Sequence, residues 1–154
     1  MPSIKSAQSE PAPAGLCILT SNVALILAGH GSEFSAYKEI VEQLAAIVRA
    51  RSPFLTVKVG FMEMCNPTLH DALASAVEAG AEKIIVLPVL LSESRHTTED
   101  IPKLLGLEKG RTYGTFSMRS RSVEIVYGRP VGADTRLADI ILDRATEAIR
   151  DRSS

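Results

Sequence analysis

The sequence predicts a single α/β domain in which a parallel sheet carries helices on both faces. Short apolar runs alternate with amphipathic segments along most of the chain, which is the pattern of repeated strand–helix units. The chain has 154 residues, of which 45% are hydrophobic, so it can bury one core rather than two. Helices between such strands make right-handed crossovers, and crossovers of this kind connect parallel strands.

The first 20 residues are expected to form a flexible tail, which leaves residues 21–152 for the domain. The opening MPSIKSAQSEPAPAG carries three prolines among small polar residues and lacks the long apolar run of a secretory signal. Nowhere does the chain reach the roughly 18 consecutive apolar residues that a membrane span needs. We therefore expect a soluble protein without a membrane partner.

Charge and cysteine content argue against several classes of protein. The formal net charge is -1 and tryptophan is absent, so the Lys/Arg excess and the stacking rings of a nucleic-acid-binding surface are missing. Cys17 and Cys65 stand in no CxxC or other metal-ligand spacing, which argues against a disulfide framework and against a zinc ribbon. A reducing cytoplasm is the expected location.

The first strand–helix–strand unit begins at residue 23. VALILA, residues 23–28, is typical of a buried strand, and GHGS, residues 29–32, interrupts it before a helical pattern starts. A second strand is expected within FLTVKVGFM, around Val57. In the helix between them, these apolar residues are expected to face the sheet: Tyr37, Ile40, Val41, Leu44, Ile47 and Val48.

The middle of the chain repeats this pattern. The second helix is predicted to begin with Asn66 as its cap and Pro67 in its first position, and to end at Gly80. KIIVLPVLL, from Lys83, is the third predicted strand. A polar loop then leads to a short helix from about Thr98, whose hydroxyl can cap it.

The last third of the chain is predicted to add one strand and one helix. EKGRTYGTFSMRSRS breaks all periodicity and is expected to be a mobile loop, whereas VEIVYGRPV reads as a fourth strand. ADTRLADIILDRATEAIRD closes the chain as an amphipathic helix with Asp134 as its cap. We predict a flavodoxin-like, four-stranded parallel sheet of order 2-1-3-4. The ligand-binding switch point then lies between the carboxyl ends of strands one and three.

Two histidines follow those two strands and are expected to meet at this edge. His30 and His96 together provide the imidazoles that a first-row divalent metal site needs, and Glu63, just past the second strand, can join them as a ligand or proton acceptor. Such a set leaves coordination positions open, as metal delivery or catalysis requires. Each residue also has a structural alternative: His30 as a turn residue bonded to a backbone carbonyl, His96 as a solvated loop side chain, and Glu63 as a favourable charge at a helix N-terminus.

Other polar and sulfur-containing residues near the strand ends have simpler interpretations. Gly29 and Gly31 let the backbone approach a ligand and can free N–H groups for an anion. His70 is expected to be exposed on the second helix. Three residues are expected to serve mainly as buried apolar filler: Met62, Met64 and Cys65. A basic set is expected either to be solvated or to fold over the site and attract a polyanion: Lys109, Arg111, Arg119 and Arg121.

Four blocks of this sequence together resemble the small sirohydrochlorin chelatases, which are class II tetrapyrrole chelatases. The blocks are LAGHGS, GFMEMCNPTLHDAL, VLPVLLSESRHTTEDIP and YGRPVGADTRLADIILDR, and they span about residues 23–144 in the family's order. The resemblance implies a chelatase-like single domain that forms a homodimer and inserts a divalent metal without an organic cofactor. It also implies that His30 and His96 bind the incoming ion and that Glu63 belongs to the active site.

The substrate that the resemblance implies is a polycarboxylate ring, for which N–H groups and basic side chains at the rim are natural partners. The candidate substrate-binding residues are Gly31, Ser32, Pro67, Ser92, Arg95 and Thr97. Co2+ insertion in cobalamin biosynthesis is the first hypothesis, and Fe2+ insertion for sirohaem or Ni2+ insertion is the alternative, because histidine and carboxylate accept all three ions.

Two hypotheses from other classes remain. A non-catalytic metal carrier or tetrapyrrole-binding protein would need the histidines but no turnover. A phosphate or nucleotide binder could use residues 29–32 at a helix N-terminus, but the chain lacks GxGxxG and P-loop spacings and this hypothesis gives His96 no role.

Overall fold

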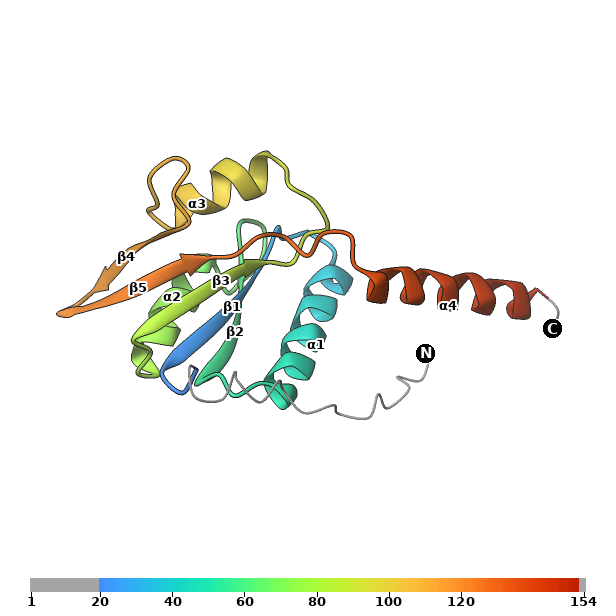
Figure 1. Ribbon diagram of the computed structural model, residues 1–154, viewed down its shortest axis with the longest axis horizontal. Coiled ribbons are helices and arrows are strands. Elements are labelled where there is room, and N and C mark those ends of the chain that lie inside the picture. The colour runs from blue at the N-terminus through green and yellow to red at the C-terminus, as the bar shows by residue number, and fades with distance from the viewer. Residues whose placement is uncertain (1–19, 153–154) are drawn as a thin grey trace.

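The computed structural model describes residues 20–152, in which strands and helices alternate along the chain (Figure 1). The expected tail at residues 1–19 therefore lies outside the described residues. The strands are β1 (Val23–Gly29), β2 (Thr56–Phe61), β3 (Lys83–Pro88), β4 (Tyr113–Met118) and β5 (Arg121–Tyr127). The helices are α1 (Ser35–Arg51), α2 (Leu69–Glu78), the π-helical turn η1 (His96–Asp100), α3 (Ile101–Leu104) and α4 (Thr135–Asp151).

The sheet has five strands in the order β2-β1-β3-β5-β4. β1, β2, β3 and β5 are parallel, so the four predicted strands lie in the predicted 2-1-3-4 order. The predicted number of strands is wrong, because β4 pairs antiparallel with β5 in a segment expected to be a mobile loop. Phe116 and Met118 alternate inward from β4 and pack against the core, a two-residue period that the surrounding polar residues obscure in the sequence.

Helices cover both faces of the sheet, as predicted. One core cluster joins Ala24, Ile26 and Ala28 of β1 to α2, α3 and β5. On the other face, Leu25 and Leu27 of β1 pack with residues of α1 and β2. Because its side chains alternate between these two clusters, all seven residues of β1 are buried.

α1 buries less of its predicted apolar face than its sequence pattern indicates. Val41 and Ala45 are buried against the sheet, but Ile40 and Leu44 are 57% and 40% exposed, and Ile47 is exposed as well. The expectation that all six apolar residues face the sheet is therefore wrong. The apolar arc of α1 is wider than its contact with β1 and β2, and an exposed apolar strip remains.

α2 begins later than predicted. Thr68, rather than Asn66, is its cap: the Thr68 side chain accepts from the Asp71 N–H, and the Asp71 carboxylate accepts from the Thr68 N–H. These hydrogen bonds lower the pKa of Asp71. The predicted start is wrong because the Pro67 carbonyl still accepts from the N–H of Phe61 at the end of β2. The predicted end at Gly80, which has φ +96°, is confirmed.

The predicted short helix also begins earlier, at His96, with the wide turn η1. The Thr98 hydroxyl does not cap it but donates to the Ser94 carbonyl.

α4 begins at the predicted cap, where Asp134 accepts from the Arg136 N–H. It covers neither face of the sheet, however, and projects away from the rest of the chain (Figure 1). No residue of α4 is buried. Within residues 20–152, no helix has the length and apolar character needed to cross a membrane.

We expect Thr68→Ala to lower the free energy of unfolding by about 1 kcal/mol, because α2 loses its capping box. Urea unfolding monitored by circular dichroism measures the change. The matched control is Thr146→Ala in the exposed middle of α4, where alanine is the better helix former and no loss is expected. Equal losses in the two variants would contradict the assigned cap.

Candidate active site

His30 and His96 meet at the predicted switch point of the sheet. His30 directly follows β1, and His96 opens η1 after β3, the strand beside β1. Their ring centroids are 4.5 Å apart with an interplanar angle of 67°. The prediction that residues 66 positions apart lie side by side is therefore confirmed.

Glu63 reaches the same rim from the end of β2. Its Oε1 atom lies 3.4 Å from Nε2 of His30. The side chains of His30, His96 and Glu63 are 31%, 45% and 56% exposed, so all three are open to solvent. Within residues 20–152, no group of three or more His, Cys, Asp or Glu residues is arranged to hold a metal ion. The three predicted residues thus gather at one open edge but form no closed cage.

Main-chain hydrogen bonds fix the loop of His30 against the loop of Glu63. The Met62 N–H donates to the Gly29 carbonyl over 3.0 Å, and the Glu63 N–H donates to the His30 carbonyl over 3.2 Å. The Cys65 thiol extends this ladder: it donates to the Ser32 carbonyl and accepts from the Ser32 N–H. The separation between His30 and Glu63 is therefore set by the backbone.

Gly31 permits this close approach of the two loops. Its φ is +99°, and a Cβ atom there would lie 1.8 Å from the carbonyl oxygen of Glu63. Any other residue would push the two loops apart. The glycine that precedes the first helix is therefore needed for packing between loops.

The alternative interpretation of His30, as a turn residue bonded to a backbone carbonyl, is correct for only one of its two ring nitrogens. Its Nδ1 lies 3.0 Å from the Gly31 carbonyl oxygen, as expected of a turn residue, while its Nε2 faces Glu63. A carbonyl oxygen only accepts, so when the ring is neutral its proton is on Nδ1 and the lone pair of Nε2 is available to an ion. His30 can therefore occupy its turn and bind an ion at the same time.

Three residues that support the site were not identified from the sequence. The Tyr37 hydroxyl accepts from the His30 N–H over 3.1 Å, and the buried Tyr127 hydroxyl donates to the Thr97 carbonyl over 2.8 Å. Burial raises the pKa of Tyr127 to about 12, so this phenol stays a donor. Asp100 contacts the His96 ring at 2.9 Å. Of these three residues, only Asp100 could be inferred from the sequence. It comes four residues after His96, and residues four apart share one face of a helix.

The N–H groups proposed for the substrate carboxylates are mostly used within the chain. The Ser32 N–H donates to Cys65, the Thr97 N–H donates to the Ser94 carbonyl, and Pro67 has no N–H. The Thr97 side chain is buried and bonded to Ser94 as well. The expectation of exposed N–H groups after Gly31, near Pro67 and near Thr97 is therefore wrong for Ser32, Thr68 and Thr97, whose N–H groups all donate within the chain.

Two other rim candidates remain accessible. Ser92 is exposed in the loop before η1. The Arg95 side chain is 80% exposed, and its Nε lies 3.6 Å from Glu99.

Most of the predicted basic set lies away from this rim. Arg119 occupies the turn between β4 and β5, and Arg121 donates to the Val77 carbonyl at the end of α2. Both are at the opposite end of the sheet, so the hypothesis that they fold over the site is wrong (Figure 1). Arg111 bonds to the Tyr113 hydroxyl. Lys109 lines a hollow of about 270 Å³ beside η1 and α3.

Met62 and His70 lie where the sequence predicts them, whereas Met64 and Cys65 do not. Met62 packs against the core as predicted, but Met64 is 59% exposed with φ +60°, because the chain leaves the strand at Phe61 and turns sharply. Cys65 is half-buried and holds the hydrogen bonds to Ser32. His70 is exposed, as predicted, and its ring contacts that of Phe116.

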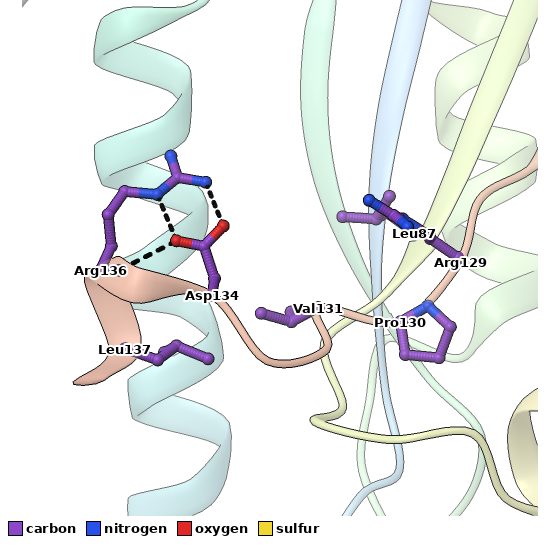
Figure 2. Close-up of a pocket in the computed structure, with 7 residues that line it drawn as sticks. All are labelled: Leu87, Arg129, Pro130, Val131, Asp134, Arg136 and Leu137. Atoms are coloured by element: carbon purple, nitrogen blue, oxygen red, sulfur yellow. Dashed lines mark hydrogen bonds and ion pairs between the residues drawn. The ribbon is translucent and has the colours of Figure 1, made fainter. Parts of the chain in front are cut away.

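A second hollow, of about 380 Å³, lies where the chain leaves β5 for α4 (Figure 2). Leu87, Pro130, Val131 and Leu137 give it an apolar lining. At its edge Asp134 pairs with Arg136 through both carboxylate oxygens, at 2.7 and 2.8 Å. This pair lowers the pKa of Asp134 well below its usual range and engages the Arg136 guanidinium.

Comparison with known proteins places the chain among chelatases. A family model described as CbiX matches residues 24–148. The sirohydrochlorin cobaltochelatase of Methanopyrus kandleri is 42% identical over 142 residues, covering 82% of this chain and 97% of that protein. The sirohydrochlorin cobaltochelatase of Methanocaldococcus jannaschii is 41% identical over 138 residues, covering 79% and 96%.

A solved structure has a similar fold. The sirohydrochlorin chelatase SirB from Bacillus subtilis subspecies spizizenii, in complex with cobalt, matches with a TM-score of 0.70 and 25% identity. The match covers 82% of this chain and 50% of SirB, so the chain corresponds to half of that protein.

We expect Gly31→Ala to lower the free energy of unfolding by about 3 kcal/mol, because a Cβ atom adds both backbone strain and a collision with the Glu63 carbonyl. The matched control is Gly106→Ala: Gly106 also has positive φ, +72°, but nothing lies within 4 Å of the added atom. This control isolates the backbone strain, about 1 kcal/mol. Urea unfolding compares the two variants, and equal losses would contradict the close packing of the two loops.

Proposed function

The chain belongs to the CbiX family, and from that premise we propose that it is a sirohydrochlorin cobaltochelatase, which inserts Co2+ into sirohydrochlorin for cobalamin biosynthesis. The observation that carries the proposal is the meeting of His30, His96 and Glu63 at the open switch point of the sheet. Ligand-binding residues in open α/β sheets lie at such a point. The names of the similar proteins favour cobalt over Fe2+ and Ni2+.

The geometry of His30 and Glu63 suits a first-row divalent ion. Two donors that each lie about 2.1 Å from such an ion at the tetrahedral angle are about 3.4 Å apart. The distance between His30 Nε2 and Glu63 Oε1 is 3.4 Å. An ion can therefore be held between these two atoms with little movement of either loop, and the His96 ring, whose centroid is 4.5 Å from that of His30, is close enough to join as a further ligand.

An open set of ligands fits insertion better than storage. The ion must lose water, bind over one face of the ring and then leave the protein as its bonds to the pyrrole nitrogens form. Two N–H protons leave the ring in that step, and the half-exposed Glu63 carboxylate can accept a proton and pass it to solvent. Neutral imidazoles hold the ion without the very high affinity that a closed cage of thiolates or carboxylates would give.

The accessible candidates for the substrate's carboxylates are Arg95 and Ser92, on the loop between β3 and η1. A guanidinium can bind a carboxylate through two parallel hydrogen bonds. Ser32, Pro67 and Thr97 shape the rim through the main-chain framework, and Gly31 allows the loops to close on each other. In this proposal the ion and the ring are both substrates, no organic cofactor takes part, and the reaction takes place in the cytoplasm.

We also propose that residues 21–152 act as one domain within a homodimer. The apolar residues Ile140, Ile141 and Leu142 of α4 are 50%, 67% and 65% exposed, and α4 projects from the rest of the chain (Figure 1). The exposed strip of Ile40, Leu44 and Ile47 on α1 offers a matching apolar surface. The apolar hollow at the base of α4 adds to this surface (Figure 2). Exposed apolar areas of this extent mark contact with another protein, and a second copy presents the same areas.

We expect His30→Ala and His96→Ala each to reduce Co2+ insertion by about 100-fold or more, because the ion loses a ligand. The change in the visible spectrum of sirohydrochlorin under anaerobic conditions measures the rate, with Fe2+ and Ni2+ as parallel assays. His70→Ala is the matched control, since His70 lies on α2 against Phe116 and should leave the rate unchanged.

Three outcomes would count against parts of this proposal. Binding of the ring or the ion without faster insertion would favour the carrier hypothesis over an enzyme. Faster insertion of Fe2+ or Ni2+ than of Co2+ would overturn the choice of metal. An equal loss in His70→Ala would show that the histidine substitutions act on folding.

We expect Ile141→Asp to shift the protein toward a monomer, because a carboxylate would be buried in the proposed apolar contact. Sedimentation velocity measures the change in mass. Arg150→Gln lowers the charge of α4 by the same one unit on the side of the helix opposite Ile141 and should leave the dimer intact. A monomeric unmodified protein, or equal dissociation in both variants, would overturn the proposed dimer.

A further inference from the structure

We propose that Asp100 is a positioning residue, which holds the His96 ring in the tautomer whose Nε2 is free of a proton and able to bind an ion. Asp100 Oδ2 lies 2.9 Å from His96 Nδ1. The importance of this tautomer for catalysis rests on the proposed function, whereas the tautomer itself can be measured without it.

The first argument is the chemistry of the contact. A carboxylate only accepts hydrogen bonds, so the partner atom Nδ1 must carry a proton. A neutral imidazole has one ring proton, and with that proton on Nδ1 the lone pair is on Nε2. Carboxylate partners of this kind orient histidine ligands and increase their basicity in many metal sites.

The second argument is the shape of the turn that carries both residues. η1 is a π-helical turn of five residues from His96 to Asp100, closed by the Ile101 N–H donating to the His96 carbonyl. Single π turns of this kind are frequent at functional sites. The turn places the His96 ring and the Asp100 carboxylate next to each other on one side.

The third argument is that the backbone beneath the pair cannot shift easily. Ile101, directly after Asp100, is fully buried. Thr97, directly after His96, is buried and exchanges two hydrogen bonds with Ser94. The Tyr127 hydroxyl, on β5, donates to the Thr97 carbonyl. The backbone that carries Asp100 and His96 is therefore anchored to the core, although their side chains are partly exposed.

The two histidines then present the same ring atom, Nε2, to an ion, but their Nδ1 atoms bond to different groups. His30 Nδ1 is bonded to the Gly31 carbonyl and His96 Nδ1 to a carboxylate, so both rings offer Nε2. A carboxylate is the stronger acceptor, which makes His96 the more electron-rich of the two donors. Asp100 thus makes the two imidazoles unequal as electron donors to an ion, which their spacing alone would not do.

Long-range 1H–15N spectra of the imidazoles, recorded on the metal-free full chain at mildly alkaline pH, test the proposal. We expect His96 to carry its proton on Nδ1 in the unmodified chain. In Asp100→Asn and Asp100→Ala, the ring should move toward the Nε2–H form that free neutral imidazole prefers. Co2+ insertion by these variants should fall about 10- to 100-fold, and Asp100→Glu should restore part of the rate.

The matched control addresses the charge near Arg95. Arg95 Nε lies 4.0 Å from Asp100 and 3.6 Å from Glu99, so Asp100→Asn also removes a charge beside Arg95. Glu99→Gln removes the neighbouring charge without touching His96, and the His96 tautomer should not change. His70 signals identical to those of the unmodified chain show that each variant is folded. If Asp100→Ala does not fold, Asp100→Asn alone tests the proposal.

The outcomes separate the inference from the proposed function. A proton on His96 Nε2 in the unmodified chain, or an unchanged tautomer in both Asp100 variants, would overturn the inference. A tautomer change as expected, in a protein whose unmodified form inserts no metal, would support the positioning role of Asp100 and overturn the chelatase function.

Discussion

Parallel pairing of β1 with β2 on one edge and β3 on the other is the constraint on which the site depends. In this register Gly29 lies opposite Phe61 of β2, and Ala28 lies opposite Pro88 of β3. The three strands therefore end at one level, and the loops that follow them start from the same edge of the sheet. A one-residue slip of β1 would turn its buried side chains to the other face and move His30 away from both partners.

The same constraint explains which parts of the site were predictable. Apolar runs predict β1, β2, β3 and β5, and the predicted strand order places His30 and His96 together at one edge of the sheet. The approach of Glu63 followed from the end of β2. Tyr37 and Tyr127 could not be assigned in this way, because each acts through a hydrogen bond between its hydroxyl and main chain outside its own element, seven residues away for Tyr37 and 30 for Tyr127. Such bonds leave no periodic pattern in a sequence.

Failures in the fold prediction have physical causes as well. β4 was missed because only Phe116 and Met118 among its inward residues are large and apolar. The start of α2 was misplaced because Pro67 is acceptable in a first helical turn, yet its carbonyl is already bonded to β2. On α1 and α4, helical periodicity correctly indicated apolar faces, but it cannot distinguish a face that meets its own sheet from one that meets another surface.

The unpacked state of α4 has a thermodynamic consequence. An isolated helix of 17 residues is only marginally stable in water, and α4 buries none of its residues on its own chain. In the proposed homodimer, the helical content of α4 would depend on mass action between chains, and the order of the C-terminal segment would vary with protein concentration. The cooperative folding unit would then include both chains of the dimer, and dilution alone would unfold α4 in part.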